Sequence, residues 1–344
     1  MARSAGKNSR REPTSNLAAI HLIEAGMQRI TANTSSTLVA PVEPPASELL
    51  FLVGRPPIPD YLVFMRSHTI GGQLLTDRVL MDTWRTANDH VQQLQNHEAG
   101  CADGAKLTPL PASMVPLSET IAGAPVLAQY ALPVEIGLVD LDRLVTYQRH
   151  INLEHSRRLQ AELGPTPSDE AVFSICFPLD TPRPSVTLSG GGNAFAFLSP
   201  SNDLRVLGIV PLSPDRVSGL EMYGPVSSVI GVLVGYSTNW MSALFVEDRL
   251  VLMQGTHRAH ALRAAGLTHV PCLVQHVSTR DELQVLQIPE LLQQGDVYLK
   301  QARPPLLKDF FDERLRTVVR VPRRYHQVVV QLEMHAGAID LPAA

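Results

Sequence analysis

This sequence lacks paired cysteines and long apolar runs, and we expect no secretory leader. Its three cysteines, Cys101, Cys176 and Cys272, are widely spaced and odd in number, which excludes a disulfide framework and favours a reducing compartment. The longest apolar run, Val226–Tyr236, is broken by glycine and serine and is too short to cross a bilayer. No apolar stretch follows the basic first residues, which argues against a secretory signal. We therefore expect a cytoplasmic protein with no membrane association.

A strong excess of positive charge is also lacking. The formal net charge is −4, whereas non-specific binding to DNA requires several phosphates to be neutralised by lysine and arginine. The most basic local segment is Arg314–Arg324, which either contacts DNA or forms the solvated face of a strand whose apolar side holds Val318, Val319 and Val321. Aromatic residues for base stacking do not interleave with these arginines. Nucleic acid is therefore the less favoured kind of partner.

The length and composition are those of a chain with a full hydrophobic core. Its 344 residues are 44% hydrophobic and 18% charged, and a chain of this size is typical of two domains. Apolar spacing predicts helices over Thr14–Ile30 and Leu74–Leu94. Proline and serine predict a surface loop over Thr34–Pro59, and Gly100–Pro133 reads as loop-rich. From Val134 to about Val277 the pattern changes to short strands and turns.

These changes of texture predict four parts along the chain. They are a flexible basic tail at 1–15, a helical and loop-rich N-terminal region at 16–130, a domain at 131–300 with an insertion at about 165–245, and a C-terminal extension at 301–344.

The most informative motif is Val251–Val274, which predicts a buried strand, a Gly-Thr-His-Arg turn, a short helix, a glycine stop and a second strand. The first N–H groups of a helix have no partner within it, and the helix dipole favours an anion there. Gly255 allows close approach of the backbone, Thr256 and His257 offer polar side chains, and Arg258 brings a charged fork that suits phosphate oxygens. The motif therefore predicts a phosphate-binding turn.

The same motif resembles the nucleotide-binding motif of the ParB and sulfiredoxin superfamily. The matching pieces are, in order, a strand, a G-x-x-R turn, a helix, a glycine and a strand that opens with Val-Pro: Leu250–Gln254, Gly255–Arg258, Ala259–Ala265, Gly266 and Val270–Val274. An upstream segment, Val134–Leu159, resembles the opening strand, a loop holding Gln148, Arg149 and His150, and the first helix of ParB-type domains.

The resemblance implies an α+β fold, with a ParB/sulfiredoxin-like mixed sheet core, flanking helices and an N-terminal helical region. It also implies that the two segments meet around a nucleotide, ATP or CTP with Mg²⁺, held by Gly255–Arg258 and by Gln148, Arg149 and His150. The leading hypothesis is a nucleotide-binding protein that performs phosphoryl or nucleotide chemistry on a small substrate. The alternatives are a non-catalytic module whose nucleotide controls association with a protein partner, and a DNA-associated ParB-like protein or nuclease.

Three departures from the family pattern limit what is carried over. The two matching segments lie roughly a hundred residues apart, about twice the expected spacing, so a large insertion separates them. Sulfiredoxins place a reactive cysteine in the turn, where this chain has Thr256, so repair of sulfinic acid is disfavoured. No pair of helices typical of a helix-turn-helix DNA reader follows Val277.

A kinase-like reaction would require a carboxylate that accepts a proton from a hydroxyl group. Glu154, Glu247 and Asp248 are weak candidates because they lie in or beside the matching segments, and each is also typical of a surface charge.

The insertion contains a run of three glycines, Gly190, Gly191 and Gly192, followed by Asn193. Glycines between apolar strands either form a second ligand-contacting loop or connect a tight hairpin.

Histidines and a cysteine also crowd the motif: His257, His260, His269, Cys272 and His276. Their spacing along a strand and a helix does not close a four-ligand site. We expect no structural metal and interpret Cys272 as a buried core thiol. Near the end, Arg303–Leu315 is either a docking segment or a lead-in whose Phe310 and Phe311 fill the core.

Overall fold

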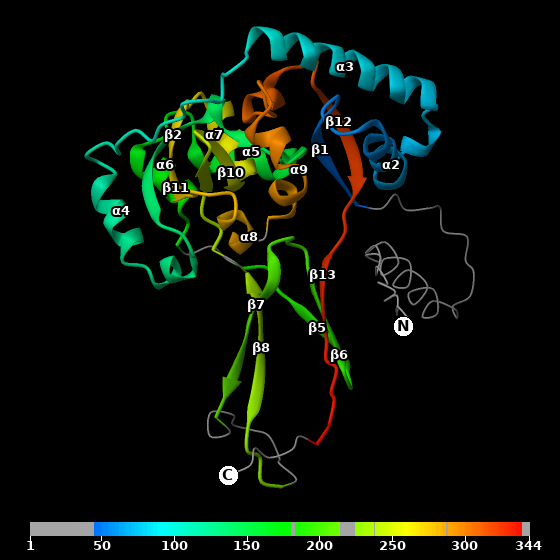
Figure 1. Cartoon of the computed structure of the whole chain (residues 1–344). Helices are drawn as coiled ribbons and strands as arrows, with labels where there is room; N and C mark the ends of the chain where they lie inside the picture. Colours follow the sequence, from blue (N-terminus) through cyan, green and yellow to red (C-terminus); the bar gives the residue numbers. More distant parts are fainter. Residues whose placement is uncertain (1–44, 180–182, 214–223, 237, 287, 339–344) are drawn as a thin grey trace, which may run out of the picture. The chain divides into compact units, whose positions relative to one another are not determined.

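The computed structural model describes residues 45–179, 183–213, 224–236, 238–286 and 288–338, all within one compact unit that spans Pro44–Ala344. The chain there is a mixed α+β structure with several sheets (Figure 1). The predicted basic tail and the helix predicted at Thr14–Ile30 lie outside the described residues. None of the described helices has the length and apolar character needed to span a membrane.

A five-stranded mixed sheet forms the centre of this unit, in the order β2-β11-β9-β10-β3. β11 pairs parallel with β9 and β10 pairs parallel with β3, whereas β11 with β2 and β9 with β10 are antiparallel. The strands are β2 (Val134–Asp140), β3 (Val145–Thr146), β9 (Ser242–Val246), β10 (Arg249–Gln254) and β11 (His269–His276). The side chains of β9, β10 and β11 are largely buried on both faces, which explains why these strands read as nearly continuous apolar runs. β9 thus belongs to the central sheet, although its sequence falls in the expected insertion.

Three helices pack beside this sheet, namely α5 (Leu153–Leu163), α6 (Asp169–Cys176) and α7 (Thr256–Ala264). α5 contacts α7, and α6 contacts both β11 and α7. Side-chain caps set where two of them begin: Asn152 accepts from the His155 N–H at α5, and Ser168 accepts from the Ala171 N–H at α6. α7 has no such cap, and its first residue, Thr256, lies within the turn that the sequence placed before the helix.

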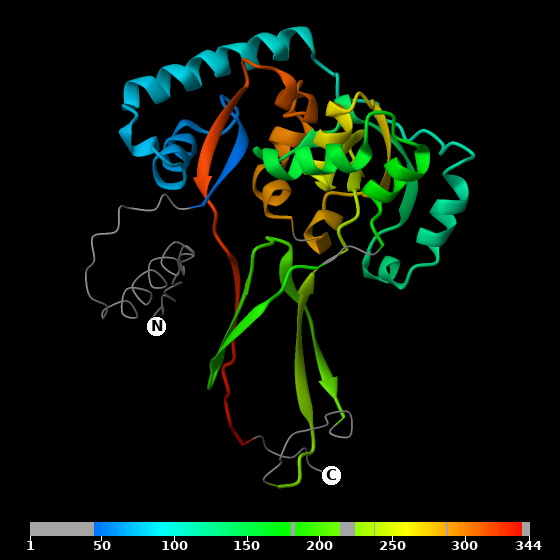
Figure 2. The same ribbon diagram turned by 180° about the vertical axis from the view of Figure 1, so that it is seen from behind.

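A second sheet joins distant parts of the chain in the order β12-β1-β4, with β1 (Ala46–Leu52), β4 (His150–Asn152) and β12 (Arg316–Pro322). Figure 2 shows β1 in blue beside β12 in orange. The surface loop predicted over Thr34–Pro59 is therefore wrong for its described part, because β1 is a central strand in which Leu49, Leu50 and Phe51 are buried. The apolar run of this segment is long enough for a strand, and its partner lies at the far end of the sequence.

Two helices pack beside β1, namely α2 (Ile58–His68) and α3 (Asp77–His97). The helix predicted at Leu74–Leu94 is confirmed, but it begins after Thr76, whose hydroxyl accepts from the Val79 N–H. Leu74 precedes it and is 82% exposed. The other described helical segments are η1 (Gly72–Leu74), α4 (Val115–Ala122), η2 (Pro125–Gln129), η3 (Leu141–Arg143), α8 (Glu282–Leu286), α9 (Pro289–Leu299) and η5 (Leu307–Phe311).

The described part of the C-terminal extension supplies side chains to the hydrophobic core and strand β12 to the second sheet. Phe310 is fully buried and Phe311 packs against the same core, which confirms the core-filling interpretation of these aromatics. The strand predicted within Arg314–Arg324 is β12, where Val319 and Val321 pack inward with the cluster around β1. Val318 was wrongly assigned to that side: it is 54% exposed because neighbouring residues of a strand face opposite ways.

Two further sheets complete the described chain. One has the order β13-β6-β5 and the other is the hairpin β7-β8. The strands are β5 (Thr187–Gly191), β6 (Ala194–Ser199), β7 (Leu204–Leu212), β8 (Val229–Tyr236) and β13 (His326–Gln331). Four of them come from the expected insertion, and β13 is contributed by the C-terminal extension.

Candidate functional site

The turn after β10 and the loop after β3 leave the central sheet at the same edge. The two strands are parallel neighbours, with Val251 opposite Val145 and Leu252 opposite Thr146, so their C-terminal ends lie side by side. The Tyr147 hydroxyl donates a hydrogen bond to the Met253 carbonyl at 3.0 Å, just beyond the paired residues. The structure therefore brings the G-x-x-R turn and the upstream segment together across roughly a hundred residues of sequence.

Gly255 makes the corner at which α7 begins. Its φ is +94°, a left-handed conformation that favours glycine, and an added Cβ would lie 3.1 Å from Met241 Cγ. The first helical hydrogen bond joins the Ala259 N–H to the Gly255 carbonyl. The N–H groups of Thr256, His257 and Arg258 precede that bond, and no side chain caps them. This end of α7 therefore has the backbone geometry that suits an anion.

Arg258 is 6% exposed and donates a hydrogen bond from Nη1 to Asn239 Oδ1 at 2.9 Å. Burial lowers its pKa, while Cys176 and Asp203 nearby act in the opposite direction. No ion pair with a carboxylate involves Arg258 within the described residues. Its buried charge is thus bonded to a neutral amide.

Imidazole rings gather beside Arg258. The His257 and His155 rings meet edge to face at 5.3 Å, so α5 and α7 each contribute one ring. The pKa of His257 is lowered to about 3, first by burial and then by His155, His150 and His260. The pKa of His155 is also lowered, by burial, Arg158 and Arg258. Both rings are therefore neutral at pH 7, and each can donate or accept one hydrogen bond.

The upstream loop reaches this corner mainly through His150. That residue lies in β4 opposite Phe51, it is electrostatically coupled to His257, and burial lowers its pKa. Arg149 is engaged elsewhere, since its Nη1 lies 3.4 Å from Asp60 Oδ2. The backbone N–H of Gln148 donates a hydrogen bond to Thr146 Oγ1 at 3.2 Å.

Of the three carboxylates considered for proton transfer, two lie apart from the turn and the third is held in an ion pair. Glu154 pairs with Arg323. Glu247 and Asp248 form the β9–β10 turn, with φ of +47° and +64°. That turn stands at the opposite end of β10, and six strand residues span about 20 Å.

Each carboxylate of the β9–β10 turn already has a partner. Glu247 pairs with Arg280, and Asp248 accepts from the Gly104 N–H at 2.7 Å. Glu247 and Asp248 therefore lie away from the turn, whereas Glu154 precedes His155 in α5 and is paired with Arg323, and we assign no general base.

The glycine run forms the hairpin between β5 and β6. Gly191 pairs with Ala194, which leaves Gly192 and Asn193 as the two turn residues. Gly190 has a φ of +132°, and a Cβ there would lie 2.4 Å from the Ala194 carbonyl oxygen, so the glycine is required by the hairpin itself. The Asn193 carbonyl accepts from the Leu332 N–H at 2.8 Å. The local geometry is thus that of the hairpin connection.

Cys272 is fully buried, and burial raises the pKa of its thiol, as expected for a core cysteine. Among the residues that the structure describes, no group of three or more histidine, cysteine, aspartate or glutamate side chains is arranged to hold a metal ion.

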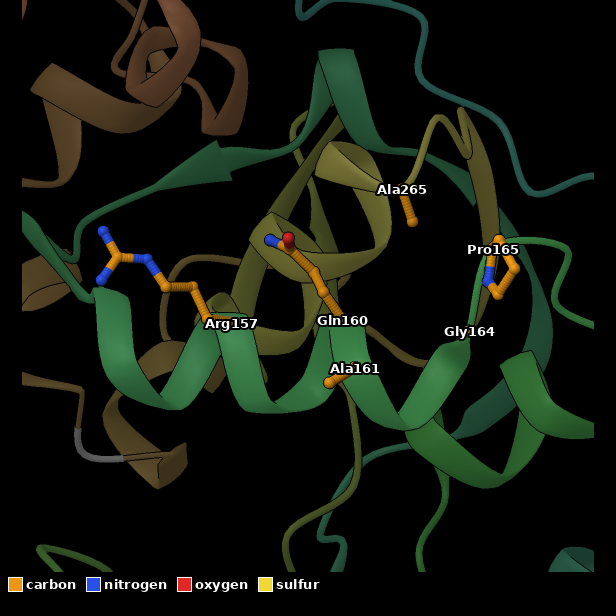
Figure 3. A pocket seen from close by; sticks show the side chains of 6 residues that line it. All are labelled: Arg157, Gln160, Ala161, Gly164, Pro165 and Ala265. Atoms are coloured by element: carbon orange, nitrogen blue, oxygen red, sulfur yellow. The ribbon is translucent and has the colours of Figure 1, made fainter.

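Two surface hollows lie away from the turn. The first lies between the C-terminal ends of α5 and α7 and is lined by Arg157, Gln160, Ala161, Gly164, Pro165 and Ala265 (Figure 3). The second is formed largely by α9. At the turn, Thr256 and Arg258 are covered by the protein's own side chains. A ligand at the α7 N-terminus must therefore take the place of Asn239 on Arg258.

Sequence reasoning missed two residues of this corner. His155 had a local signal, because Asn152 is a helix-capping residue and places His155 in the first turn of α5. Asn239 had none, since its contact with Arg258 depends on the tertiary fold.

No family model, no curated protein and no solved structure matches the chain.

Proposed function

We propose that this chain binds a phosphate-bearing ligand, a nucleotide such as ATP or CTP with Mg²⁺, at the N-terminus of α7. The observation that carries the proposal is the parallel pairing of β3 with β10, which places the loop before His150 and the Gly255 turn at one edge of the sheet. The resemblance to ParB and sulfiredoxin proteins implies the same meeting of these two segments.

The groups at this corner suit phosphate oxygens. The backbone of Thr256, His257 and Arg258 presents N–H groups at the positive end of the helix dipole. The Arg258 guanidinium lies next to them and has a neutral amide, Asn239, as its hydrogen-bond acceptor. Exchange of that amide for a phosphate would replace a neutral acceptor with a charged one, which roughly doubles the strength of a hydrogen bond.

Binding without catalysis is the form of the proposal that the geometry favours. Glu154, Glu247 and Asp248 are each bonded to other groups, and two of them stand at the far end of β10. A nucleotide at α7 would contact helices α5 and α7 together, because His155 and His257 touch across them. Ligand-dependent coupling of these two helices is the physical basis for a module that controls association with a protein partner.

The experiment is calorimetric titration of the full chain with ATP and with CTP, each with and without Mg²⁺. Replacement of Arg258 by alanine removes one charge-assisted hydrogen bond and is expected to weaken binding by about 10- to 100-fold. The matched control is Arg263→Ala on the same helix, whose guanidinium pairs with Asp142 at the other end of α7 and whose loss should leave affinity unchanged.

The proposal fails if the wild-type chain binds neither nucleotide or if Arg258→Ala binds as tightly as wild type. Arg258→Lys separates charge from geometry, because it keeps the positive charge and removes the planar fork. Release of phosphate or pyrophosphate from the bound nucleotide would then distinguish an enzyme from a non-catalytic module.

A further inference from the structure

The hairpin β7–β8 exposes apolar side chains that no hydrophobic cluster of the described residues includes. Ile209 is 67% exposed and Ile230 is 72% exposed, and the register puts both on one face, since Pro211 opposes Ile230 and Ile209 opposes Val232. Leu233, on the opposite face, is 48% exposed. A two-stranded hairpin with apolar residues on both faces is marginally stable alone.

Among the described residues, side-chain contacts hold the base of the hairpin, and β7 also approaches β13. Leu204 is 1% exposed, and the Tyr236 hydroxyl donates to the Pro184 carbonyl at 3.0 Å and lies 2.7 Å from Ser199 Oγ. Beyond this base the two strands extend as a long two-stranded ribbon (Figure 1).

The two edges of the hairpin differ in chemistry. β7 carries a charge at Arg205, a proline at Pro211 and a bulge in which Leu207 has no partner on β8. Charge, proline and bulges are the three features by which natural edge strands prevent pairing with other strands. β8 is eight residues long, carries no charge and no proline, and pairs only with β7 among the described strands. One edge is thus blocked, and the other is open.

We propose that the open edge of β8 pairs antiparallel with β8 of a second copy of this chain, about a two-fold axis at Val232. A second copy is the occupant that an uncharged strand favours. In a two-fold contact the residue on the axis meets its own equivalent, and its neighbours lie close to theirs, so any charge there would lie near a like charge. β8 has none, and it also offers nothing by which a charged partner would be recognised.

The side-chain pattern of β8 fits this register. Directly opposed residues must share a face, so the axis passes through a residue. With the axis at Val232, Ile230 opposes Val234 on one face, and Leu233 opposes Gly231 on the other. On the first face two β-branched side chains, Ile230 and Val234, are thus paired across the strands. On the second face each Leu233 is paired with a glycine, which leaves room for it. The blocked β7 edges then flank a four-stranded sheet and stop it from growing further.

The test is the molar mass of the full chain, measured by light scattering and by sedimentation over a range of concentrations. Wild type is expected at twice the mass of one chain. Val232→Lys places two ammonium groups at the axis and should raise the dimer dissociation constant by about 100-fold or more. The control is Val285→Lys in α8, a valine that is 61% exposed and lies outside the hairpin, which should leave the dimer intact.

A pair of variants with opposite charges shows whether Val232→Lys loses the dimer through charge repulsion or through misfolding. Val232→Glu alone should also be monomeric, and an equimolar mixture with Val232→Lys should restore the dimer, which an unfolded chain cannot do. Val232→Cys should form an interchain disulfide on oxidation, whereas Leu233→Cys should not. A monomeric wild type at about 100 µM, or a Val232→Lys variant as dimeric as wild type, overturns the proposal. Either result leaves the nucleotide proposal untouched.

Discussion

Part of the acid sensitivity of the core should come from the buried His260, in addition to that of His257. Its ring is 5% exposed, stacks on Phe311 at 4.8 Å between ring centres, and has its Nδ1 2.8 Å from Ser156 Oγ. Its Nε2 is buried with no hydrogen-bond partner in the described residues. Burial, aided by Arg316, lowers the pKa of His260 from 6.5 to about 4.

Whether acid lowers or raises the stability of the fold depends on which state, folded or unfolded, binds the proton more tightly. In the unfolded chain the imidazole is protonated below its ordinary pKa of 6.5, whereas in the folded chain it stays neutral down to about pH 4. The stability that this group contributes is therefore fully present above pH 6.5 and is lost as the pH falls towards 4. Between pH 7 and pH 5 the loss amounts to about 2 kcal/mol.

Urea unfolding at pH 7 and at pH 5 measures this loss, with the fluorescence of Trp240, which is 1% exposed in the same core cluster, as the probe. His260→Asn retains a polar group near Ser156 and cannot be protonated. It is expected to be less stable than wild type at pH 7, because it loses the ring contact with Phe311. Its further loss between pH 7 and pH 5 should be smaller than that of wild type by about 2 kcal/mol. If the variant loses as much stability over this interval as wild type, the assignment to His260 is refuted.

Two other substitutions test contacts that hold the C-terminal extension and the segment after β1. Asp309→Asn removes the charge that Arg303 and Arg55 share at 2.5 and 3.0 Å, and should lower the free energy of unfolding by about 3–5 kcal/mol, with the exposed Asp82→Asn as the control that changes it little. Gly54→Ala should unfold at markedly lower urea concentration, since its Cβ would come within 2.6 Å of the Ala87 backbone. Gly71 also has a positive φ, but an added Cβ there would meet open space. An equally large fall in the urea midpoint for Gly71→Ala would therefore contradict the steric explanation.

Local patterns predicted the strand, turn, helix and strand of Val251–Val274 well. β10, α7 and β11 lie where apolar runs, Gly255 and Gly266 indicate them, because each signal is contained within a few residues. The helix begins at Thr256 and not at Ala259, since the polar residues of the turn themselves form its first turn. The α+β class, which the resemblance implied, is confirmed.

Features that depend on distant contacts were beyond sequence reasoning. β1 was predicted as part of a surface loop because its partner strand, β12, begins far away at Arg316. Glu247 and Asp248 were considered as catalytic candidates for their closeness in sequence to Gly255, yet an extended strand separates them from it by about 20 Å. The contact of His155 with His257 also arises only when α5 packs on α7.

The position of β1 between β4 and β12 has a consequence during synthesis. β12 follows β1 by more than 260 residues, so one edge of β1 stays unpaired until almost the whole chain has left the ribosome. At about 5–20 residues per second, that interval lasts roughly 13–50 s. During this time the nascent polypeptide displays an apolar ribbon, Leu49–Leu52, and chaperone binding should be strongest at that ribbon until Arg316 emerges.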